Sequence, residues 1–533
     1  MSLLPGPLRS RSDLLVAGAA VVVVLGLALV APSQVGMLLA GLAIACVVGV
    51  VALSNPLLAL LAVVLASFLR TAQKEIISAE ALTPAFYAML IALAIALAKR
   101  TRDLPKLGFV EWMMTVYLVW NVVSALLPHQ YDTTDPLTGQ SVEVYRWIFS
   151  GVILPFVVYV VAKTVLDTEK AVRWFLWTVV GMTAYSAVIA FMQFHGPKSL
   201  VWPRFIIESP EWEGRAVGVF NQPVVNGILL VLGFVVCLFL ATRPDTDRRV
   251  RWGLYALTLL TAYAVQLTHT RSALLSLVVA LIMGAVFANG WRKPFLVYLG
   301  AGALGVAAFA GTIFSSDRSE GGIGSSNEIY DRLNIIATGL KAIGEHPFVG
   351  IGIARFRLYN TYEHVAWDQT VDWNRGFGII SHQNELGIAA ELGIPGVLMW
   401  VGVLVGVLWL LWRALVELPR NEFLGQPLAV LAATAMIVLI ANGTTVDLRI
   451  LDFAQLLPFL LAGMAVGQLD RHRARHAVGR RGLPGSGLPG GMSVRDQLAW
   501  DDARLGSRRT GPPSPPVGTP AQRVPDRIAS GSR

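Results

Sequence analysis

Long apolar blocks constrain this chain more than any other feature of its sequence. They recur along most of its 533 residues, and each is about 20 residues long, the length that an α-helix needs to cross a bilayer. Charged residues make up only 14% of the chain and its mean hydropathy is +0.60, whereas roughly a quarter of the residues of a soluble protein are charged. We therefore predict an all-α polytopic membrane protein.

The blocks predict about 12–14 transmembrane helices, with the third and fourth segments the shortest. The predicted segments are 14–31, 35–53, 56–69, 83–98, 108–127, 144–164, 171–194, 223–242, 252–268, 272–289, 295–314, 385–413, 427–446 and 450–467.

Alternate connections differ in charge, and this difference predicts the topology. The basic connections are KRTRDLPK (99–106), Lys163–Arg173, RPDTDRRVR (243–251), WRKP (291–294) and RALVELPR (413–420). Because cytoplasmic loops are enriched in Lys and Arg, we expect these connections and both termini in the cytoplasm. The loop 195–222 with Arg215, the THTR turn with Arg271, the long loop 315–381 and His382 then lie outside. Within that loop, IYDRLNIIATGLKAIG (329–344) has the spacing of an amphipathic helix.

Composition also excludes several classes of protein. The net charge of +9 lies in loops and in the tail, so we relate it to topology rather than to nucleic acid. Cys46 and Cys237 both lie in apolar blocks, which argues against a disulfide framework. The first apolar block is one of many, so no cleavable signal peptide is expected.

His382 is the first candidate for chemistry, at the start of SHQNELGIAAELGIPG (381–396). A neutral imidazole accepts a proton near pH 7 and is the commonest general base. The structural alternative is a helix start, with Ser381 as the N-cap and Gln383, Asn384 and Glu385 satisfying free N–H groups of the first turn. Gly393 and Gly396 indicate either a kink or a close-packing site.

Three arginines are candidate ligands for an anion. Arg271 lies between two apolar blocks that have almost no loop between them. A helix that starts at Arg271 directs free N–H groups and a guanidinium at one point, which suits a phosphate. A boundary arginine also reaches to lipid headgroups without further function. Arg332 and Arg215 have both an anion-binding interpretation and a structural one, as ion-pair partners of neighbouring acidic residues.

Two aromatic residues of the long outer loop, Trp367 and Trp373, are candidates for stacking on sugar rings or for packing inside the loop. The sequence has no pair of histidines at helical spacing with a carboxylate and no Asp-x-Asp in the first outer loop. It also lacks a P-loop and a nucleophile elbow. We therefore expect no metal and no cofactor.

The segment from His382 to Gly396 fits the pattern H-[NSQ]-x9-G-x-x-G. Together with TRSALL, GRAVGVFNQP and DRLNIIATGLKAIGEHPFVGIG, it resembles the O-antigen ligase and polymerase family of bacterial envelope proteins. The resemblance covers roughly 205–465. It implies a glycosyltransferase of GT-C-like architecture, multi-pass in the bacterial cytoplasmic membrane, that works at the outer face without a metal. The donor would be a glycan on undecaprenyl diphosphate and the acceptor a hydroxyl.

The resemblance also implies roles for particular residues. Arg271 and Arg332 match the diphosphate-binding arginines, Arg215 matches a less certain auxiliary ligand, and His382 matches the base that deprotonates the acceptor. Gln383 and Asn384 would lie beside the acceptor or sugar. The acceptor hydroxyl, on another glycan, on lipid A–core or on a protein, stays open, as does ligase against polymerase. Membrane lipids are the other expected partners. No nucleic acid is expected as a partner.

Three regions follow from this interpretation. Residues 1–200 hold N-terminal transmembrane helices, 201–468 form the catalytic membrane domain with outer loop 315–381, and 469–533 form a tail. The tail is basic and rich in Pro and Gly, which predicts a disordered cytoplasmic segment. The alternative function is a transporter or flippase of a lipid-linked or anionic saccharide. Transporters usually place ionisable residues near the bilayer midplane, whereas the polar residues here concentrate at one face.

Overall fold

A computed structural model describes residues 55–481, apart from 77–79, 104, 209–211, 309–310, 312–325, 375 and 377. The segments predicted at 14–31 and 35–53 lie outside these residues, as do Cys46 and residues 482–533 of the predicted tail. The last described helix, α20, continues to Arg481, beyond the predicted start of the tail at residue 469.

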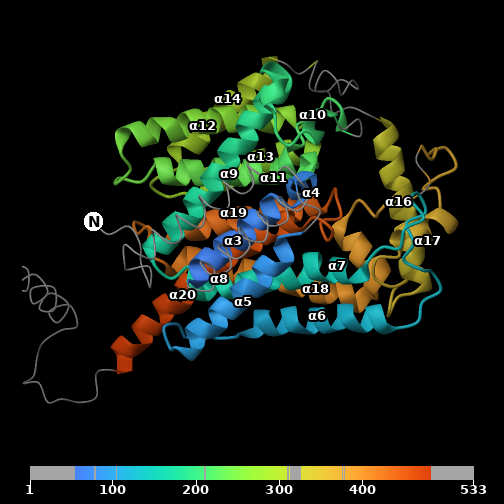
Figure 1. Cartoon of the computed structure of the whole chain (residues 1–533), viewed down its shortest axis with the longest axis horizontal. Coiled ribbons are helices and arrows are strands. Elements are labelled where there is room, and N and C mark those ends of the chain that lie inside the picture. Colours follow the sequence, from blue (N-terminus) through green and yellow to red (C-terminus); the bar gives the residue numbers. More distant parts are fainter. Residues whose placement is uncertain are drawn as a thin grey trace, which may run out of the picture. The chain divides into compact units, whose positions relative to one another are not determined.

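Helices and loops make up the described residues, apart from an isolated antiparallel bridge between Thr134 and Ser141 (Figure 1). In chain order the elements are α3 (Pro56–Phe68), α4 (Arg70–Ile76), α5 (Leu82–Ala98), α6 (Phe109–Leu126), α7 (Val144–Ile148), the π-helix η1 (Phe149–Ile153), α8 (Leu154–Val165), α9 (Glu169–His195), the short 3₁₀-helix η2 (Lys198–Leu200), α10 (Phe205–Glu208), the short 3₁₀-helix η4 (Gly218–Phe220), α11 (Pro223–Ala241), α12 (Arg248–Leu267), α13 (Arg271–Phe287), α14 (Lys293–Ala308), α16 (Ser326–Glu345), α17 (Phe356–Tyr362), α18 (Asn384–Glu417), α19 (Gln426–Gly443) and α20 (Asp452–Arg481).

Every apolar segment predicted from 56–69 onwards is helical over most of its described residues, which confirms the all-α polytopic class. Within the described residues, 7 helices are long and apolar enough to cross a membrane. They are Phe109–Leu126, Val144–Val165, Glu169–His195, Pro223–Ala241, Asn384–Glu417, Gln426–Gly443 and Asp452–Ala477. Helices α3, α5, α13 and α14 are apolar but shorter, so the total of about 12–14 spans stays a prediction.

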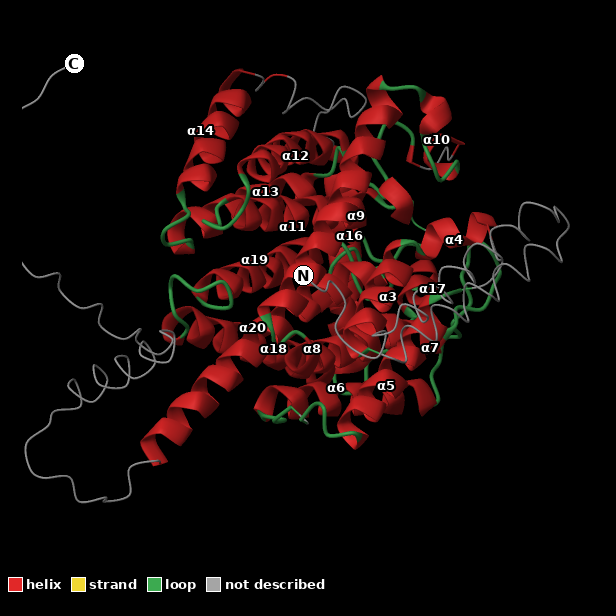
Figure 2. Cartoon of the chain, turned by 60° about the vertical axis from the view of Figure 1, so that its left-hand side comes forward, coloured by secondary structure: helices red, strands yellow, loops and turns green. Residues whose placement is uncertain are grey.

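Helix α11 is the centre of the bundle. All of its residues are buried, and Figures 1 and 2 show it between α13 and α19. Its sequence is apolar on every side, as expected of a helix with no exposed face. Gly233 allows α9 to approach closely, because a Cβ there would lie 1.8 Å from Thr183 Oγ1. Small residues permit this kind of contact between membrane helices.

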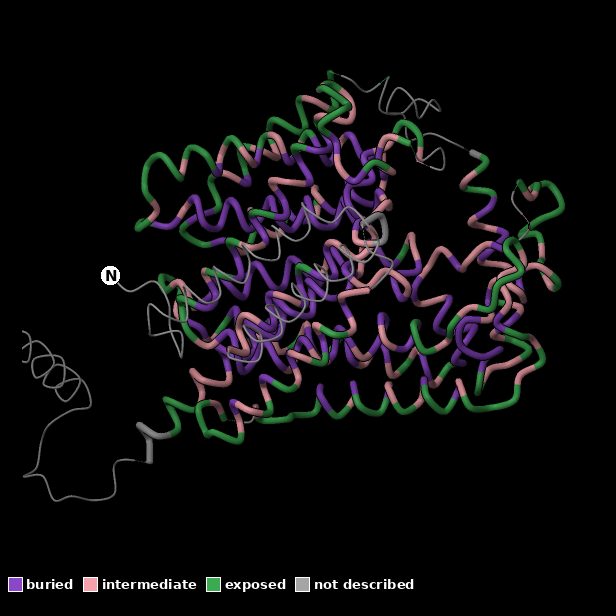
Figure 3. The backbone as a smooth tube through the Cα atoms, in the orientation of Figure 1, coloured by how far each residue is buried: buried purple, intermediate pink, exposed green. Residues whose placement is uncertain are grey.

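Helix α6 lies at the edge of the bundle and exposes an apolar stripe along its length (Figure 3). Large exposed apolar side chains in a row indicate contact with lipid or a partner rather than with water. The large apolar residues exposed on α6 are Phe109, Trp112, Val116, Val119, Val122, Val123 and Leu126.

Ion pairs link several of the basic connections to one another. We call the end of the bundle where these connections meet the basic end. Helix α12 runs from this end to Leu267, so α13 begins at the other end, which we call the His382 end. Helices α16 and α17 lie across the His382 end (Figure 1). The predicted amphipathic segment 329–344 is thus confirmed as a helix, α16. The ion pairs of the basic end are Lys163–Glu111, Lys163–Asp470, Arg102–Asp167 and Arg173–Asp245.

Candidate active site

The turn between α12 and α13 brings two of the predicted arginines together. Arg215 Nη2 donates to Thr270 Oγ1 at 2.7 Å, and Arg215 Nε donates to the Thr268 carbonyl at 3.2 Å. Thr270 is the N-cap of α13, whose first residue is Arg271. The expected helix start at Arg271 is therefore confirmed, and the Arg215 guanidinium is hydrogen-bonded to Thr270, the residue that precedes Arg271.

The start of α13 presents buried hydrogen-bond donors that have no acceptor. Arg271 Nε, Arg271 Nη2 and Ser272 Oγ are all buried without a hydrogen-bond partner among the described residues. The carboxylate nearest to Arg271 Nη2 belongs to Glu328, at 3.9 Å, beyond hydrogen-bond range. Because the first N–H groups of any helix also lack intrahelical acceptors, this point concentrates positive potential.

Helix α16 brings the third predicted arginine towards this site. Glu328, which faces Arg271, lies in the first turn of α16, and Arg332 follows it at the i+4 position, on the same helix face. The same helix packs on the first turns of α18: a Cβ on Gly339 would lie 2.8 Å from the Leu386 side chain. Arg332 therefore belongs to the element that joins the Arg271 turn to the His382 segment.

His382 has left-handed backbone geometry, with φ of 50°. This conformation is uncommon for a residue other than glycine and costs roughly 1–2 kcal/mol. The next residue, Gln383, is the N-cap of α18 and makes no side-chain capping bond. The prediction of Ser381 as N-cap is wrong, because Ser381 Oγ instead contacts Asp447 Oδ2 at 3.1 Å and the Gln383 carbonyl at 2.9 Å. His382 is thus held by tertiary contacts of its neighbour.

Those contacts lead to a buried ion network that the sequence pattern did not predict. Arg449 Nη1 donates to Glu391 Oε2 at 2.7 Å, while its Nε and Nη2 donate to the two Asp447 oxygens at 2.9 and 2.5 Å. All three side chains are buried, and the Arg449 guanidinium also lies over the Trp147 ring. A lone carboxylate inside an apolar block, Glu391, was the one available signal, because such a charge needs a partner.

Helix α18 is broken at Gly393, whose φ is 71°. A side chain there would meet the Phe348 carbonyl oxygen at 2.5 Å, so the kink that the sequence predicted as one alternative is confirmed. Groups from outside the helix satisfy the backbone at the break, as a membrane helix requires. These bonds are Ile351 N to Ala390 O, Gly352 N to Glu391 O, Trp120 Nε1 to Leu392 O and Ile394 N to Pro347 O.

The starts of α13 and α18 are joined through the end of α19. Asn442 Nδ2 donates to Ser276 Oγ at 2.7 Å, which ties α19 to the second turn of α13. The following Gly443 lies against Asn384, where a Cβ would be 3.3 Å from the Asn384 Cβ. The elements that carry Arg271 and His382 therefore converge at one end of the bundle.

The remaining candidates have mixed surroundings. Trp367 is half exposed and its backbone N–H donates to Asn334 Oδ1. Trp373 packs against a small apolar cluster of α16 and α17, and we call these two helices and the loops around them the cap. Asn384 is buried with an unsatisfied Oδ1. Among the residues that the structure describes, no group of three or more His, Cys, Asp or Glu side chains could hold a metal ion.

Comparison with known proteins finds a matching family model. The model of the O-antigen ligase family matches residues 256–401, from within α12 to the middle of α18. The match contains Arg271, Arg332 and His382, while Arg215 and Arg449 lie outside it. A search of the curated proteins finds no match. The chain is therefore a polytopic membrane protein that carries an O-antigen ligase domain, an enzyme of the glycosyltransferase class.

Proposed function

We propose that this enzyme transfers a glycan from undecaprenyl diphosphate to an acceptor hydroxyl at the outer face of the bacterial cytoplasmic membrane. The observation that carries the proposal is the set of buried donors without acceptors, Arg271 Nε, Arg271 Nη2 and Ser272 Oγ, at the start of α13. An unsatisfied buried donor costs about 1–3 kcal/mol, and an anionic ligand removes that cost. The O-antigen ligase match supports a lipid-linked glycan as the source of the anion.

In this proposal the arginines bind the diphosphate. Arg271 offers its free Nε and Nη2, and Arg332 approaches on the neighbouring helix α16. Arg215 already donates to Thr268 and Thr270, so its charge adds to the potential while its hydrogen bonds fix the turn. Fixed positive charge at the leaving group stabilises the negative charge that develops as the sugar–diphosphate bond breaks.

His382 is the proposed general base. The acceptor oxygen attacks the anomeric carbon, the carbon–oxygen bond to the diphosphate breaks, and the imidazole takes the hydroxyl proton. Attack opposite the leaving group inverts the anomeric carbon. The left-handed backbone of His382 supports a functional role, because strained residues cluster at active sites. Gln383 and Asn384, next to the base, are proposed to contact the acceptor or the sugar, and the half-exposed Trp367 a sugar further along the glycan. Trp373 is the weaker candidate because it packs inside the cap.

The outer-face assignment follows from charge. The ion-paired basic connections meet at the end of the bundle away from α16 and α17. By the positive-inside rule we propose that the His382 end lies outside and that both termini are cytoplasmic. The acceptor, whether a glycan, lipid A–core or a protein hydroxyl, is resolved by transfer in vitro from a defined lipid-linked glycan. A product ladder on lipid identifies a polymerase, and a single capping step identifies a ligase.

The His382→Asn variant tests the base. Asparagine tolerates a left-handed backbone but cannot take up a proton near pH 7, so we expect transfer to fall roughly 10²–10⁴-fold with donor binding retained. The control is His364→Asn, at an exposed histidine in the loop that follows α17, which should keep full activity. Wild-type transfer rates in His382→Asn would rule out His382 as the base.

A further inference from the structure

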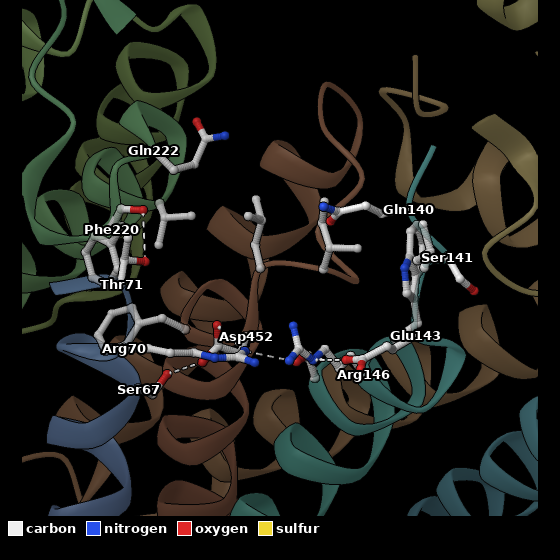
Figure 4. Close-up of a pocket in the computed structure, with 17 residues that line it drawn as sticks. Ser67, Arg70, Thr71, Gln140, Ser141, Glu143, Arg146, Phe220, Gln222 and Asp452 are labelled. Carbon is white, nitrogen blue, oxygen red and sulfur yellow. Dashed lines mark hydrogen bonds and ion pairs between the residues drawn. The ribbon is translucent and has the colours of Figure 1, made fainter. Parts of the chain in front are cut away.

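A cavity of about 530 Å³ lies beside Trp147, on the side of the N-terminal helices (Figure 4). Its volume falls within the roughly 300–1,000 Å³ of small-molecule sites. The N-terminal helices α3, α4 and α7 form much of its wall, together with the start of α11 and the start of α20. The lining residues are Ser67, Arg70, Thr71, Gln140, Ser141, Val142, Glu143, Arg146, Trp147, Ser150, Phe220, Gln222, Val225, Ile450, Leu451, Asp452 and Phe453.

The charges of this cavity are balanced within the protein. Arg70 pairs with Glu80 at 2.7 Å and with Asp452 at 3.3 Å, and Arg146 pairs with Glu143 at 2.5 Å. Figure 4 shows Arg70, Asp452 and Arg146 along one side of the cavity. Because each arginine already has a carboxylate partner, the site differs from the unsatisfied donors of Arg271 and is poorly suited to a diphosphate.

Neutral polar groups face these ion pairs. Gln222 and Gln140 lie across the cavity from Arg70 and Arg146 (Figure 4). Amides, hydroxyls and paired charges offer both donors and acceptors, which sugar hydroxyls require. Trp147 and Phe220 add aromatic surface, which suits the apolar faces of sugar rings.

Two chain segments connect the cavity to the proposed active site. Ile450, Leu451 and Asp452 continue directly from the Asp447–Arg449 segment that holds Ser381. Phe220 and Gln222 end the segment that begins at Arg215. A glycan held at the active site could therefore extend into the cavity without leaving the His382 end.

We propose that this cavity binds a sugar unit of the glycan substrate, at a distance from the bond that is made. The proposal rests on the proposed glycan transfer, and it assigns recognition to N-terminal helices that lie outside the matched ligase domain. The sugar belongs either to the donor glycan or to the acceptor glycan, and both sources present the same hydroxyl chemistry.

Photo-cross-linking tests the occupant directly. The full-length protein carries p-benzoylphenylalanine in place of Ser141, an exposed residue of the cavity lining, or in place of Ser199, an exposed control outside it. The radiolabelled probes are undecaprenyl diphosphate-linked glycan, the same glycan released from its lipid, and undecaprenyl diphosphate alone. Cross-linking of the lipid-linked glycan alone assigns the donor sugar, and cross-linking of the released glycan as well assigns the acceptor.

The proposal is overturned if undecaprenyl diphosphate alone cross-links at Ser141 as strongly as the lipid-linked glycan does. It is also overturned if no glycan cross-links at Ser141 above the level seen at Ser199. Cross-linking needs no turnover, so it separates an empty cavity from a failure of the proposed transfer.

In the transfer assay, Gln140→Ala and Arg146→Ala should raise the KM for the assigned glycan roughly 10-fold with kcat little changed. Arg204→Ala, which removes a similar exposed ion pair outside the cavity, is the control and should leave KM unchanged. An unchanged KM in both cavity variants would contradict the proposal.

Discussion

Arg271 and Arg449 lie in segments that converge on the start of α18, yet their surroundings differ in every respect that matters for function. Arg449 is buried, and its Nε, Nη1 and Nη2 all donate to carboxylates. The Arg271 side chain is 25% exposed, its Nε and Nη2 have no hydrogen-bond acceptor among the described residues, and its nearest carboxylate is 3.9 Å away.

The difference separates a structural charge from a binding charge. A buried arginine with complete partners is compensated inside the protein, and removing it leaves its carboxylates uncompensated. An arginine with free buried donors lowers the stability of the empty protein and recovers that free energy when an anion binds. The two side chains should therefore respond to substitution with opposite balances of stability and activity.

Arg449→Ala should have the largest effect. It leaves Glu391 and Asp447 buried without their cation, which costs about 3–5 kcal/mol, so we expect little folded protein and a much lower Tm. Thermal unfolding of detergent-purified protein, followed by size-exclusion chromatography, measures this loss. Arg204→Ala should change Tm little, since a surface ion pair contributes about 0–1 kcal/mol. An Arg449→Ala protein as stable as wild type would break the comparison from its structural side.

Arg271→Ala should leave the protein folded and reduce transfer roughly 10²–10³-fold, the effect of removing one donor at a developing negative charge. Undecaprenyl diphosphate should also bind more weakly, while Tm stays the same or rises because unsatisfied donors are gone. Arg271→Lys should restore part of the binding through its charge. Arg292→Ala, exposed beyond the far end of the same helix, is the matched control. Unchanged lipid affinity in Arg271→Ala would remove its assigned role.

Ser272→Ala should have the smallest effect, a reduction in donor affinity of roughly 2–10-fold, equivalent to one hydrogen bond of about 0.5–1.5 kcal/mol. Its hydroxyl is buried without a partner, so stability should not fall. Ser276, one turn later on α13, provides the contrast because it already accepts from Asn442. Ser276→Ala should lower Tm with donor affinity unchanged. If the two serines exchange these phenotypes, the division between satisfied and unsatisfied groups is not what sets function here.

Apolar length and local signals explain what could be predicted from the sequence. The helical segments follow from the requirement that a chain in lipid satisfies its own backbone, and the start of α13 at Arg271 follows from the absence of a loop before it. The kink at Gly393 was one of two readings of the signature glycines. These features depend on neighbours along the chain.

The missed features depend on partners distant in sequence. Glu391 and Arg449 pair across 58 positions, and no local pattern specifies that contact. Ser381 looked like an N-cap because serine is a preferred capping residue, but Asp447 competes for its hydroxyl. The cavity lined by Arg70 and Arg146 requires helices from opposite ends of the chain, so only the tertiary structure defines it.

The break at Gly393 gives the spacing of the signature a geometric meaning. Between Gln383 and Gly393, α18 is a short helix whose far end is fixed by Ile351, Gly352 and Trp120. Each added or deleted residue would turn the near end by about 100° about the helix axis. Because the far end cannot turn to follow, a single insertion would swing the His382 segment away from Asp447 and from α16. The number of residues between the histidine and the glycine therefore sets a rotational phase, which fixes the direction from which the base meets its substrate.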